Sequence, residues 1–194
     1  MAEVSLDVIK SLRDETGISV MQCKKALEEA DGDIDKARVI LRKASAAIAA
    51  KKSDRTLGAG TAAAYVHAGG TVVGAVVLGC ETDFVAKNED FAKMARDIAM
   101  HVAAMKPQFI TRDAVQEADI AAARSVFEKE AEKVSEEKRP MVVQGKIDSY
   151  LKEKVLLDQP FVKNGDITVG ELITQGIQKF GEKIEIMRIE RLAV

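Results

Sequence analysis

Apolar residues recur with the period of an α-helix in three successive segments near the amino terminus. The first segment ends at Thr16 and Gly17, and glycine suits the left-handed cap of a helix. Ser19 and Gln22 have capping-box spacing at the start of the second segment, and Asp33 is a suitable N-cap for the third. The predicted inward positions are Val4, Val8, Ile9, Leu12, Val20, Cys23, Leu27, Ala30, Ile34, Ala37 and Leu41. The pattern predicts a small module of three helices.

Further along the chain the period changes to that of β-strands. Residues 61–67 and 71–78 are rich in β-forming side chains and are separated by an Ala-Gly-Gly turn. This order predicts an antiparallel hairpin in which His67 faces Val72. Cys80 then lies about 26 Å from that pair at the usual rise of a strand. Cys80 and His67 therefore cannot act together as the nucleophile and base of a thiol enzyme.

Residues 82–88 read Thr-Asp-Phe-Val-Ala-Lys-Asn and stand between this hairpin and a long helical pattern. Four apolar residues here recur every seven positions, namely Phe84, Phe91, Ile98 and Met105. Phe84 can accordingly be the first core position of one long helix. Asn88 is followed by two acids, however, which is typical of a new helix start. In that second interpretation Phe84 belongs to a junction before the helix, where a partner can reach it.

The helical pattern after Asn88 has one apolar stripe, and Pro107 ends it. Its predicted inward positions are Phe91, Ala95, Ile98, Val102 and Met105. His101 lies away from this stripe, so we expect an ordinary, partly exposed histidine.

Two further helices are predicted in the charged part of the chain. Residues 118–138 form a long helix with clusters of charge that are typical of a solvated face. Pro140 interrupts it, and a second helix runs over residues 141–156. Two helices joined by a short turn pack as an antiparallel pair.

The carboxyl-terminal part begins with Thr168 and Glu171 at capping-box spacing, which opens a helix that reaches Phe180. The last segment, residues 183–192, has apolar side chains in both alternation phases. A strand that is partly covered on both faces explains that pattern.

The composition changes from Ala-rich to charged over residues 44–55, which predicts a domain boundary near residue 55. We therefore expect one domain at residues 1–54, the three-helix module with its linker, and a second at residues 55–194. The second domain combines the hairpin, the last strand and the helices. This combination predicts an α+β fold with a three-stranded antiparallel sheet packed with helices, including the antiparallel pair.

The charge balance favours protein partners. The chain has 29 Lys and Arg against 31 Asp and Glu, so it lacks the positive field of a general nucleic-acid binder. No apolar run is long enough to span a bilayer, and the first residues do not have the pattern of a signal peptide. A cytoplasmic protein that contacts neither nucleic acid nor membrane is the expectation.

Cysteine and histidine are too sparse for a metal centre or a disulfide framework. Cys23 and Cys80 are the two cysteines, and His67 and His101 are the two histidines. None of them has the spacing of a zinc site, so no metal or other cofactor is expected.

Several blocks of the sequence resemble the elongation factor Ts family. The matching blocks are Thr16-Gly17 with Met21, residues 23–27 (Cys-Lys-Lys-Ala-Leu), 32–34 (Gly-Asp-Ile), 82–88 (the signature segment), 159–162 (Gln-Pro-Phe-Val) and 168–170 (Thr-Val-Gly). The blocks extend over nearly the whole chain in the family's order. Such a set is far more specific than one short motif.

The resemblance implies a guanine nucleotide exchange factor for elongation factor Tu, without a covalent active site. It implies a family mechanism in which Asp83 and Phe84 push into the GTPase near its bound Mg²⁺ and disturb the phosphate site. The partner-contacting residues of the signature segment would be Thr82, Asp83, Phe84 and Val85. The amino-terminal module looks like a ubiquitin-associated domain that touches the same GTPase through Met21, Lys24 and Lys25.

Two alternatives stay open at this stage. Lys24 and Lys25 also fit a solvated helix face. The whole chain also fits a ubiquitin-associated-type adaptor or dimerising scaffold without exchange activity.

A homodimer is also expected. The resemblance implies this state because longer members of the family carry a second half that is similar to the core. A three-stranded sheet leaves two edges that can pair with another chain, and the doubly apolar last strand predicts a sheet face that needs covering.

Overall fold

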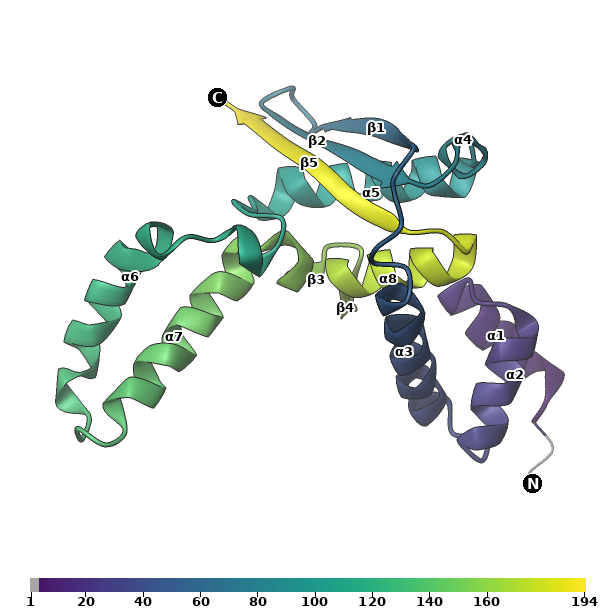
Figure 1. The fold of residues 1–194 in the computed structure, drawn as a ribbon, viewed down its shortest axis with the longest axis horizontal. Coiled ribbons are helices and arrows are strands. Elements are labelled where there is room, and N and C mark those ends of the chain that lie inside the picture. The colour runs from purple at the N-terminus through teal and green to yellow at the C-terminus, as the bar shows by residue number, and fades with distance from the viewer. Residues whose placement is uncertain (1–3) are drawn as a thin grey trace. The chain divides into compact units, whose positions relative to one another are not determined.

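The computed structural model describes residues 4–194 as a mixture of helices and two sheets (Figure 1). The elements are α1 (Leu6–Thr16), α2 (Val20–Glu29), α3 (Ile34–Ala50), β1 (Ala59–Val66), β2 (Val72–Cys80), α4 (Asp83–Ala86), α5 (Glu89–Met105), α6 (Glu117–Glu130), α7 (Arg139–Lys154), β3 (Pro160–Phe161), β4 (Asn164–Thr168), α8 (Val169–Phe180) and β5 (Ile184–Ala193). Three short 3-10 helices are η1 (Arg112–Ala114), η2 (Ala131–Lys133) and η3 (Leu156–Asp158). The α+β class predicted from the sequence is confirmed.

The chain divides into two compact units, each made of several segments. The first unit contains residues 4–63, 77–95 and 171–187, and the second contains residues 64–76, 96–170 and 188–194. Among residues 4–194, no helix is both long and apolar enough to cross a membrane.

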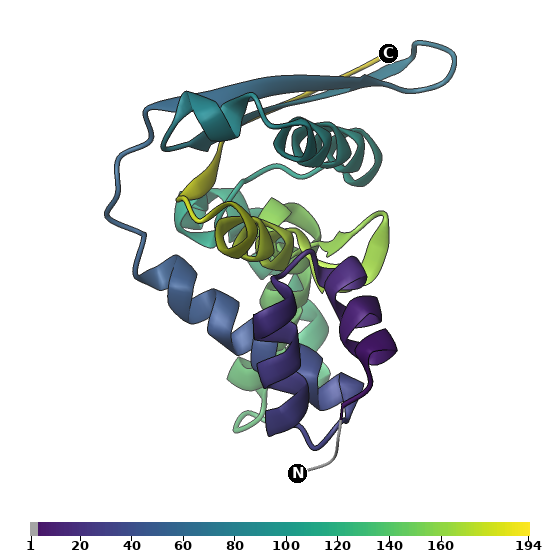
Figure 2. The same ribbon diagram turned by 90° about the vertical axis from the view of Figure 1, so that its right-hand side faces the viewer.

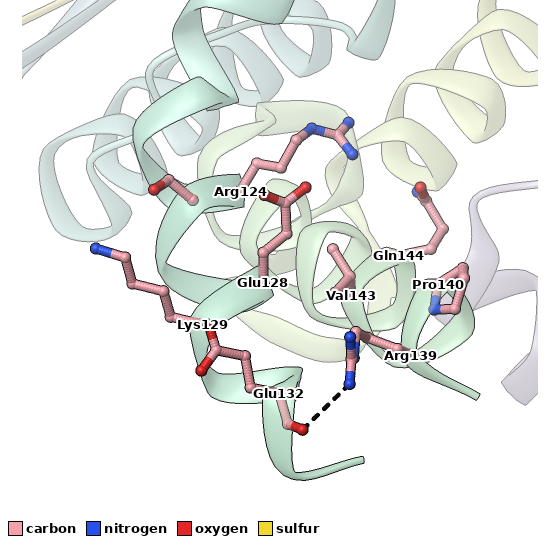
Figure 3. Close-up of a pocket in the computed structure, with 9 residues that line it drawn as sticks. Arg124, Glu128, Lys129, Glu132, Arg139, Pro140, Val143 and Gln144 are labelled. Atoms are coloured by element: carbon pink, nitrogen blue, oxygen red, sulfur yellow. Dashed lines mark hydrogen bonds between the residues drawn. The ribbon is translucent and has the colours of Figure 1, made fainter. Parts of the chain in front are cut away.

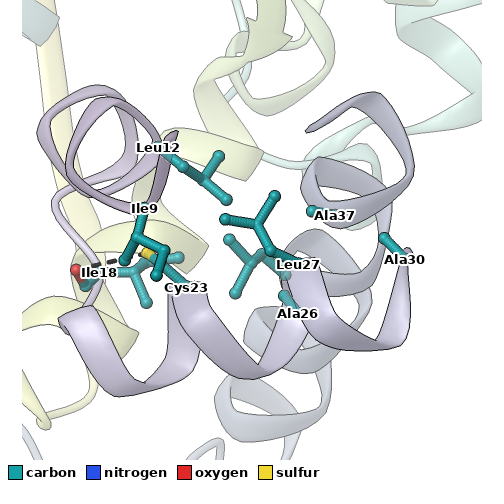
Figure 4. Close-up of a cluster of buried hydrophobic side chains, with 9 residues drawn as sticks. Ile9, Leu12, Ile18, Cys23, Ala26, Leu27, Ala30 and Ala37 are labelled. Carbon is teal, nitrogen blue, oxygen red and sulfur yellow. Dashed lines mark hydrogen bonds between the residues drawn. The ribbon is translucent and has the colours of Figure 1, made fainter. Parts of the chain in front are cut away.

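Helices α1, α2 and α3 of the first unit lie side by side (Figures 1 and 2). Their predicted caps are confirmed: Gly17 adopts a left-handed φ of 67°, the Ser19 hydroxyl accepts from Gln22 N–H, and the Asp33 carboxylate accepts from two backbone N–H groups. The buried side chains that hold the helices together (Figure 4) are Ile9, Leu12, Ile18, Cys23, Ala26, Leu27, Ala30, Ala37 and Leu41. The predicted inward position of Val20 is wrong, because its side chain is 52% exposed.

The three-stranded sheet has the order β1-β2-β5. The predicted hairpin is confirmed, since His67 N–H donates to the Val72 carbonyl and the two turn glycines have positive φ angles of 87° and 71°. β5 runs antiparallel to β2: Lys183 N–H reaches the Glu81 side chain beside the end of β2, and Val194 N–H reaches the Thr71 carbonyl at its start.

Helix α5 packs closely in both units. In the second unit a Cβ on Gly74 of β2 would lie 2.2 Å from the Ala99 carbonyl oxygen of α5, so only glycine allows this approach. In the first unit the Phe91 ring meets Phe180 edge-on at 5.7 Å. The predicted stripe is confirmed except at Met105, which is 42% exposed at the last turn.

Helices α6 and α7 of the second unit form the predicted antiparallel pair (Figure 1). They enclose a small core of Ile120, Ala131, Val143 and Ile147. The first helix is shorter than predicted, because α6 ends at Glu130 and is followed by the 3-10 turn η2. Pro140 does not separate the two helices but lies in the first turn of α7, where its missing N–H costs no hydrogen bond.

Two features of the carboxyl-terminal part differ from the expectation. Ile184 and Ile186 of β5 are buried, but Met187 is 56% exposed, so the strand is not covered on both faces at this position. The β3-β4 hairpin was not predicted, because a strand of two residues carries no readable period.

His101 is the clearest correction, because it is fully buried rather than partly exposed. Its Nε2 lies 2.8 Å from Gln159 Oε1, and its Nδ1 accepts from Val162 N–H at 3.1 Å. A carbonyl oxygen can only accept, so His101 is neutral with its proton on Nε2. Burial lowers the pKa of His101, against a raising effect of the Gln159 hydrogen bond. The histidine therefore joins α5 to the segment that leads into the β3-β4 hairpin.

The buried His101 should make the stability of the fold pH-dependent. Its pKa is lowered on folding from an ordinary value of 6.5, so the unfolded chain takes up the proton first as the pH falls. The stability is full above that value and is lost as the pH falls from it toward the folded pKa. We expect the free energy of unfolding of the wild type to decline over this range more steeply than that of His101→Gln, which does not titrate. Parallel denaturant titrations measure this difference, and equal slopes would contradict it.

Candidate functional site

The signature segment lies at the point where the chain leaves the sheet and enters a helix. β2 ends at Cys80, and α4 makes one turn over Asp83–Ala86. α5 is a separate helix that starts at Glu89, because Asn88 Oδ1 accepts from Asp90 N–H at 2.9 Å and caps it. The interpretation of one long helix with Phe84 in its core is therefore wrong.

Phe84 and Val85 have opposite surroundings on this short helix. The Phe84 side chain is 80% exposed, whereas Val85 is only 4% exposed. Val85 thus fixes α4 to the body of the protein, and Phe84 points into solvent. A large apolar side chain that is held in water in this way is available for burial against another surface.

Asp83 forms an ion pair with Lys87 one turn later, with 2.6 Å between the carboxylate and the ammonium. The hydrogen bond from Lys87 lowers the pKa of the Asp83 carboxyl, and the same bond raises the pKa of Lys87. Both side chains are about three-quarters exposed, so this pair adds little to stability. The lowered pKa keeps Asp83 ionised to a lower pH than an ordinary aspartate.

Thr82 is tied to a residue that is 100 positions away in the sequence. Its backbone N–H and that of Glu81 each donate to Glu182 Oε2 at 3.0 Å, and its hydroxyl donates to Oε1 at 2.6 Å. The Glu81 carboxylate in turn accepts from Lys183 N–H and from the Arg55 guanidinium. These two donors lower the pKa of Glu81, the Lys183 N–H most strongly. Glu182 was not predicted from the sequence, because it stands alone between the last helix and the last strand and matches no motif.

The other predicted contact residues lie on α2. Met21 is 74% exposed and follows the exposed Val20, so two apolar side chains stand together on the surface. Lys24 makes a long ion pair with Glu28 at 3.7 Å, and Lys25 is also exposed. The two lysines therefore flank an apolar spot.

A groove with a volume of about 650 Å³ lies between α6 and α7 (Figure 3). Arg139 has a structural role here, since its guanidinium donates to the carbonyls of Ala131, Glu132 and Val134. The remaining lining carries both signs of charge, so it selects no particular ligand. Across residues 4–194, no three His, Cys, Asp or Glu side chains lie close enough together to hold a metal ion.

Comparison with known proteins connects this geometry to a family. The model of a protein family described as Elongation factor TS matches residues 35–176. A protein of Desulforamulus reducens named Elongation factor Ts is 44% identical, with the alignment covering 98% of this chain and 89% of that protein. The chain belongs to the elongation factor Ts family. The resemblance of the sequence blocks is thereby confirmed.

Other members of the elongation factor Ts family agree over the same extent. The protein of that name from Carboxydothermus hydrogenoformans is 44% identical, with 97% of this chain and 88% of that protein covered. The one from Anaeromyxobacter is 42% identical, with 100% of this chain and 90% of that protein covered. The last of these alignments covers the whole chain and so includes α1, α2 and β5, which lie outside the matched part of the family model.

The exposure of Phe84 predicts that its removal leaves the fold intact. Truncating an exposed side chain changes stability by less than about 0.5 kcal/mol, so Phe84→Ala should shift the melting temperature by less than about 2 °C. Phe91→Ala is the matched control, because it removes a fully buried ring from α5. That change should cost about 3–5 kcal/mol and lower the melting temperature by roughly 6–20 °C. Calorimetry of both variants tests this, and an equally large loss for Phe84→Ala would contradict it.

Proposed function

We propose that this protein is a guanine nucleotide exchange factor for elongation factor Tu in translation elongation. The single observation that carries the proposal is the 80% exposed Phe84 in the signature segment of an elongation factor Ts family member. The relatives at 42–44% identity all carry the name Elongation factor Ts.

The proposed mechanism uses the short helix α4 as a wedge. Phe84 enters the GTPase beside its bound Mg²⁺, with Thr82 and Asp83 next to it, while the buried Val85 keeps the helix on its support. Mg²⁺ bridges the nucleotide phosphates and the GTPase, so disturbing its surroundings weakens the hold on GDP. Because linkage between two ligands is reciprocal, the factor loosens GDP as much as GDP loosens the factor. Rebinding of a nucleotide therefore releases the exchange factor.

The proposal gives the amino-terminal module a docking role. We assign residues 1–54 to a ubiquitin-associated-like domain and residues 55–194 to the core. The exposed Met21, flanked by Lys24 and Lys25, would contact the GTPase and raise affinity, while the core displaces the nucleotide. Support comes from the chemistry of the surface, in which the exposed apolar Met21 lies one helical turn before two lysines.

A homodimer is the proposed working unit. Ala62, Ala64 and Val66 alternate as the exposed side chains of β1, so this strand has an apolar face open to solvent. Met187 of β5 is also exposed. A second copy would bury such a face with two-fold symmetry. The last strand contains no cysteine, so the association would not depend on a disulfide.

Release of labelled GDP from elongation factor Tu tests the proposed exchange activity. The wild-type chain should accelerate the release, and Phe84→Ala should reduce the acceleration about ten- to a hundredfold, because burial of one Phe ring contributes about 2–3 kcal/mol. Met141→Ala is the control, since it removes a 72% exposed apolar side chain from α7. It should exchange like the wild type. A wild-type chain that neither accelerates release nor retains elongation factor Tu in a pull-down would support the adaptor alternative.

The oligomeric state has its own test in light scattering at micromolar concentration. We expect a mass near twice the 21.0 kDa of one chain, and the same result in the presence of a reductant. Val66→Lys places a charge on the open face of β1 and should shift the mass toward one chain. Val126→Lys, at a similarly exposed site on α6, should not. A wild-type mass of one chain, both alone and with elongation factor Tu, would rule out the dimer.

A further inference from the structure

Glu182 occupies a loop whose geometry directs its carboxylate to the start of the signature segment. The chain leaves α8 at Phe180 and turns through Gly181, which has a positive φ of 74° that few other residues adopt. The Lys52 side chain donates to the Gly181 carbonyl at 2.7 Å and stabilises this turn. β5 then begins at Ile184. Glu182 is thereby fixed between two ordered elements and is partly buried.

The hydrogen bonds of Glu182 replace the local support that α4 lacks. Thr82 stands at the N-cap of α4, but its hydroxyl makes no capping bond to the helix and donates to Glu182 instead. A helix of one turn is not stable without outside contacts, because nucleation is costly. The direction in which α4 leaves β2 is therefore set by Glu182 and by the buried Val85.

The anchoring is reciprocal, which makes it stiffer than a single bond. Glu182 accepts from the backbone of Glu81, and the carboxylate of Glu81 accepts from the backbone of Lys183. Hydrogen bonds to ionised groups are roughly twice as strong as those between neutral groups. Arg55 adds a charged partner to Glu81 at 3.2 Å. Two turns that are far apart in the sequence are thus joined by side chain-to-backbone contacts in both directions.

We propose that Glu182 is a positioning residue for Phe84, and that it holds the end of β2 so that the exposed ring meets the GTPase in a fixed orientation. This inference rests on the proposed exchange function. If residues 81–86 were flexible in the free protein, they would lose conformational entropy when Phe84 binds the GTPase. That entropy cost would reduce the binding free energy available to displace the nucleotide. Because Glu182 already orders this segment in the free protein, the entropy cost of binding is smaller, and Glu182 itself does not contact the partner.

The experiment compares Glu182→Ala, Glu182→Gln and the control Glu185→Ala in the release of labelled GDP at saturating factor. Glu182→Ala should reduce the maximal release rate about tenfold, which corresponds to the loss of one charged hydrogen bond. Glu182→Gln should keep it within about threefold, because an amide oxygen can accept from both backbone N–H groups and its NH₂ can donate to the Thr82 hydroxyl. Glu185→Ala removes a nearby exposed carboxylate that pairs with the Lys183 side chain, and it should have no effect.

A double-mutant cycle separates positioning from a general loss of stability. In the Phe84→Ala background, Glu182→Ala should cause no further decrease in exchange, because no ring is left to position. Hydrogen exchange of the uncomplexed protein gives a second measurement: Glu182→Ala should speed the amides of residues 81–86 about tenfold or more, and leave those of α1–α3 unchanged.

The outcomes distinguish this inference from the function on which it rests. If Glu182→Ala releases GDP at the wild-type rate, the positioning role alone is overturned. Unchanged hydrogen-exchange protection of residues 81–86 in this variant overturns it as well. Additive losses in the cycle also overturn it, since they would mean that Glu182 acts independently of Phe84. A wild-type chain without exchange activity overturns the proposed function and this inference together.

Discussion

The hydrogen bonds between the end of β2 and the loop before β5 are the contacts on which the candidate site depends. The α4 helix has one turn, its N-cap makes no side-chain capping bond, and its central aromatic is exposed. None of these features favours an ordered helix in water. The carboxylate of Glu182 and the buried Val85 supply that order from outside. An exposed Phe84 can therefore be kept in one place even though its own contacts within the chain contribute little.

The same contacts extend to the linker that follows α3. Lys52 reaches the Gly181 carbonyl, and Arg55 reaches the Glu81 carboxylate. α3 itself contacts α8 through an ion pair of Arg42 with Glu171 at 3.2 Å. Within the first unit the three-helix module is thus not structurally independent, because its last helix and linker contact α8 and the loop that carries Glu182. The proposed contact residues on α2 and the signature segment with α4 therefore belong to the same compact unit.

The sequence predicted those parts of the fold whose cause is local. The caps at Ser19 and Asp33 depend on neighbouring residues, and so does the hairpin turn at Gly69 and Gly70. The separation of α4 from α5 was one of two open interpretations, and Asn88 decided it through a bond to a residue two positions away. Such hydrogen bonds can be predicted from the sequence because their partners lie only a few positions apart.

Features with distant partners were not predictable in this way. His101 lies off the apolar stripe of its helix, yet it is buried, since Gln159 and Val162 satisfy both of its ring nitrogens from another part of the chain. A polar residue is buried only when such partners exist, and one sequence does not show where they are. Glu182 escaped detection for the same reason, since its partners lie 100 positions earlier.

The candidate site therefore has two parts with different origins. The residues proposed to meet the GTPase are contiguous and can be recognised from a motif. The residues that hold them in place are dispersed, because a rigid support for an exposed segment has to come from elements on the other side of the turn. Such a division predicts where tolerance to substitution should be found. Thr82 and Glu182 are joined by a hydrogen bond, so a substitution at either position should alter the orientation of Phe84. The exposed neighbour Glu185 should tolerate substitution.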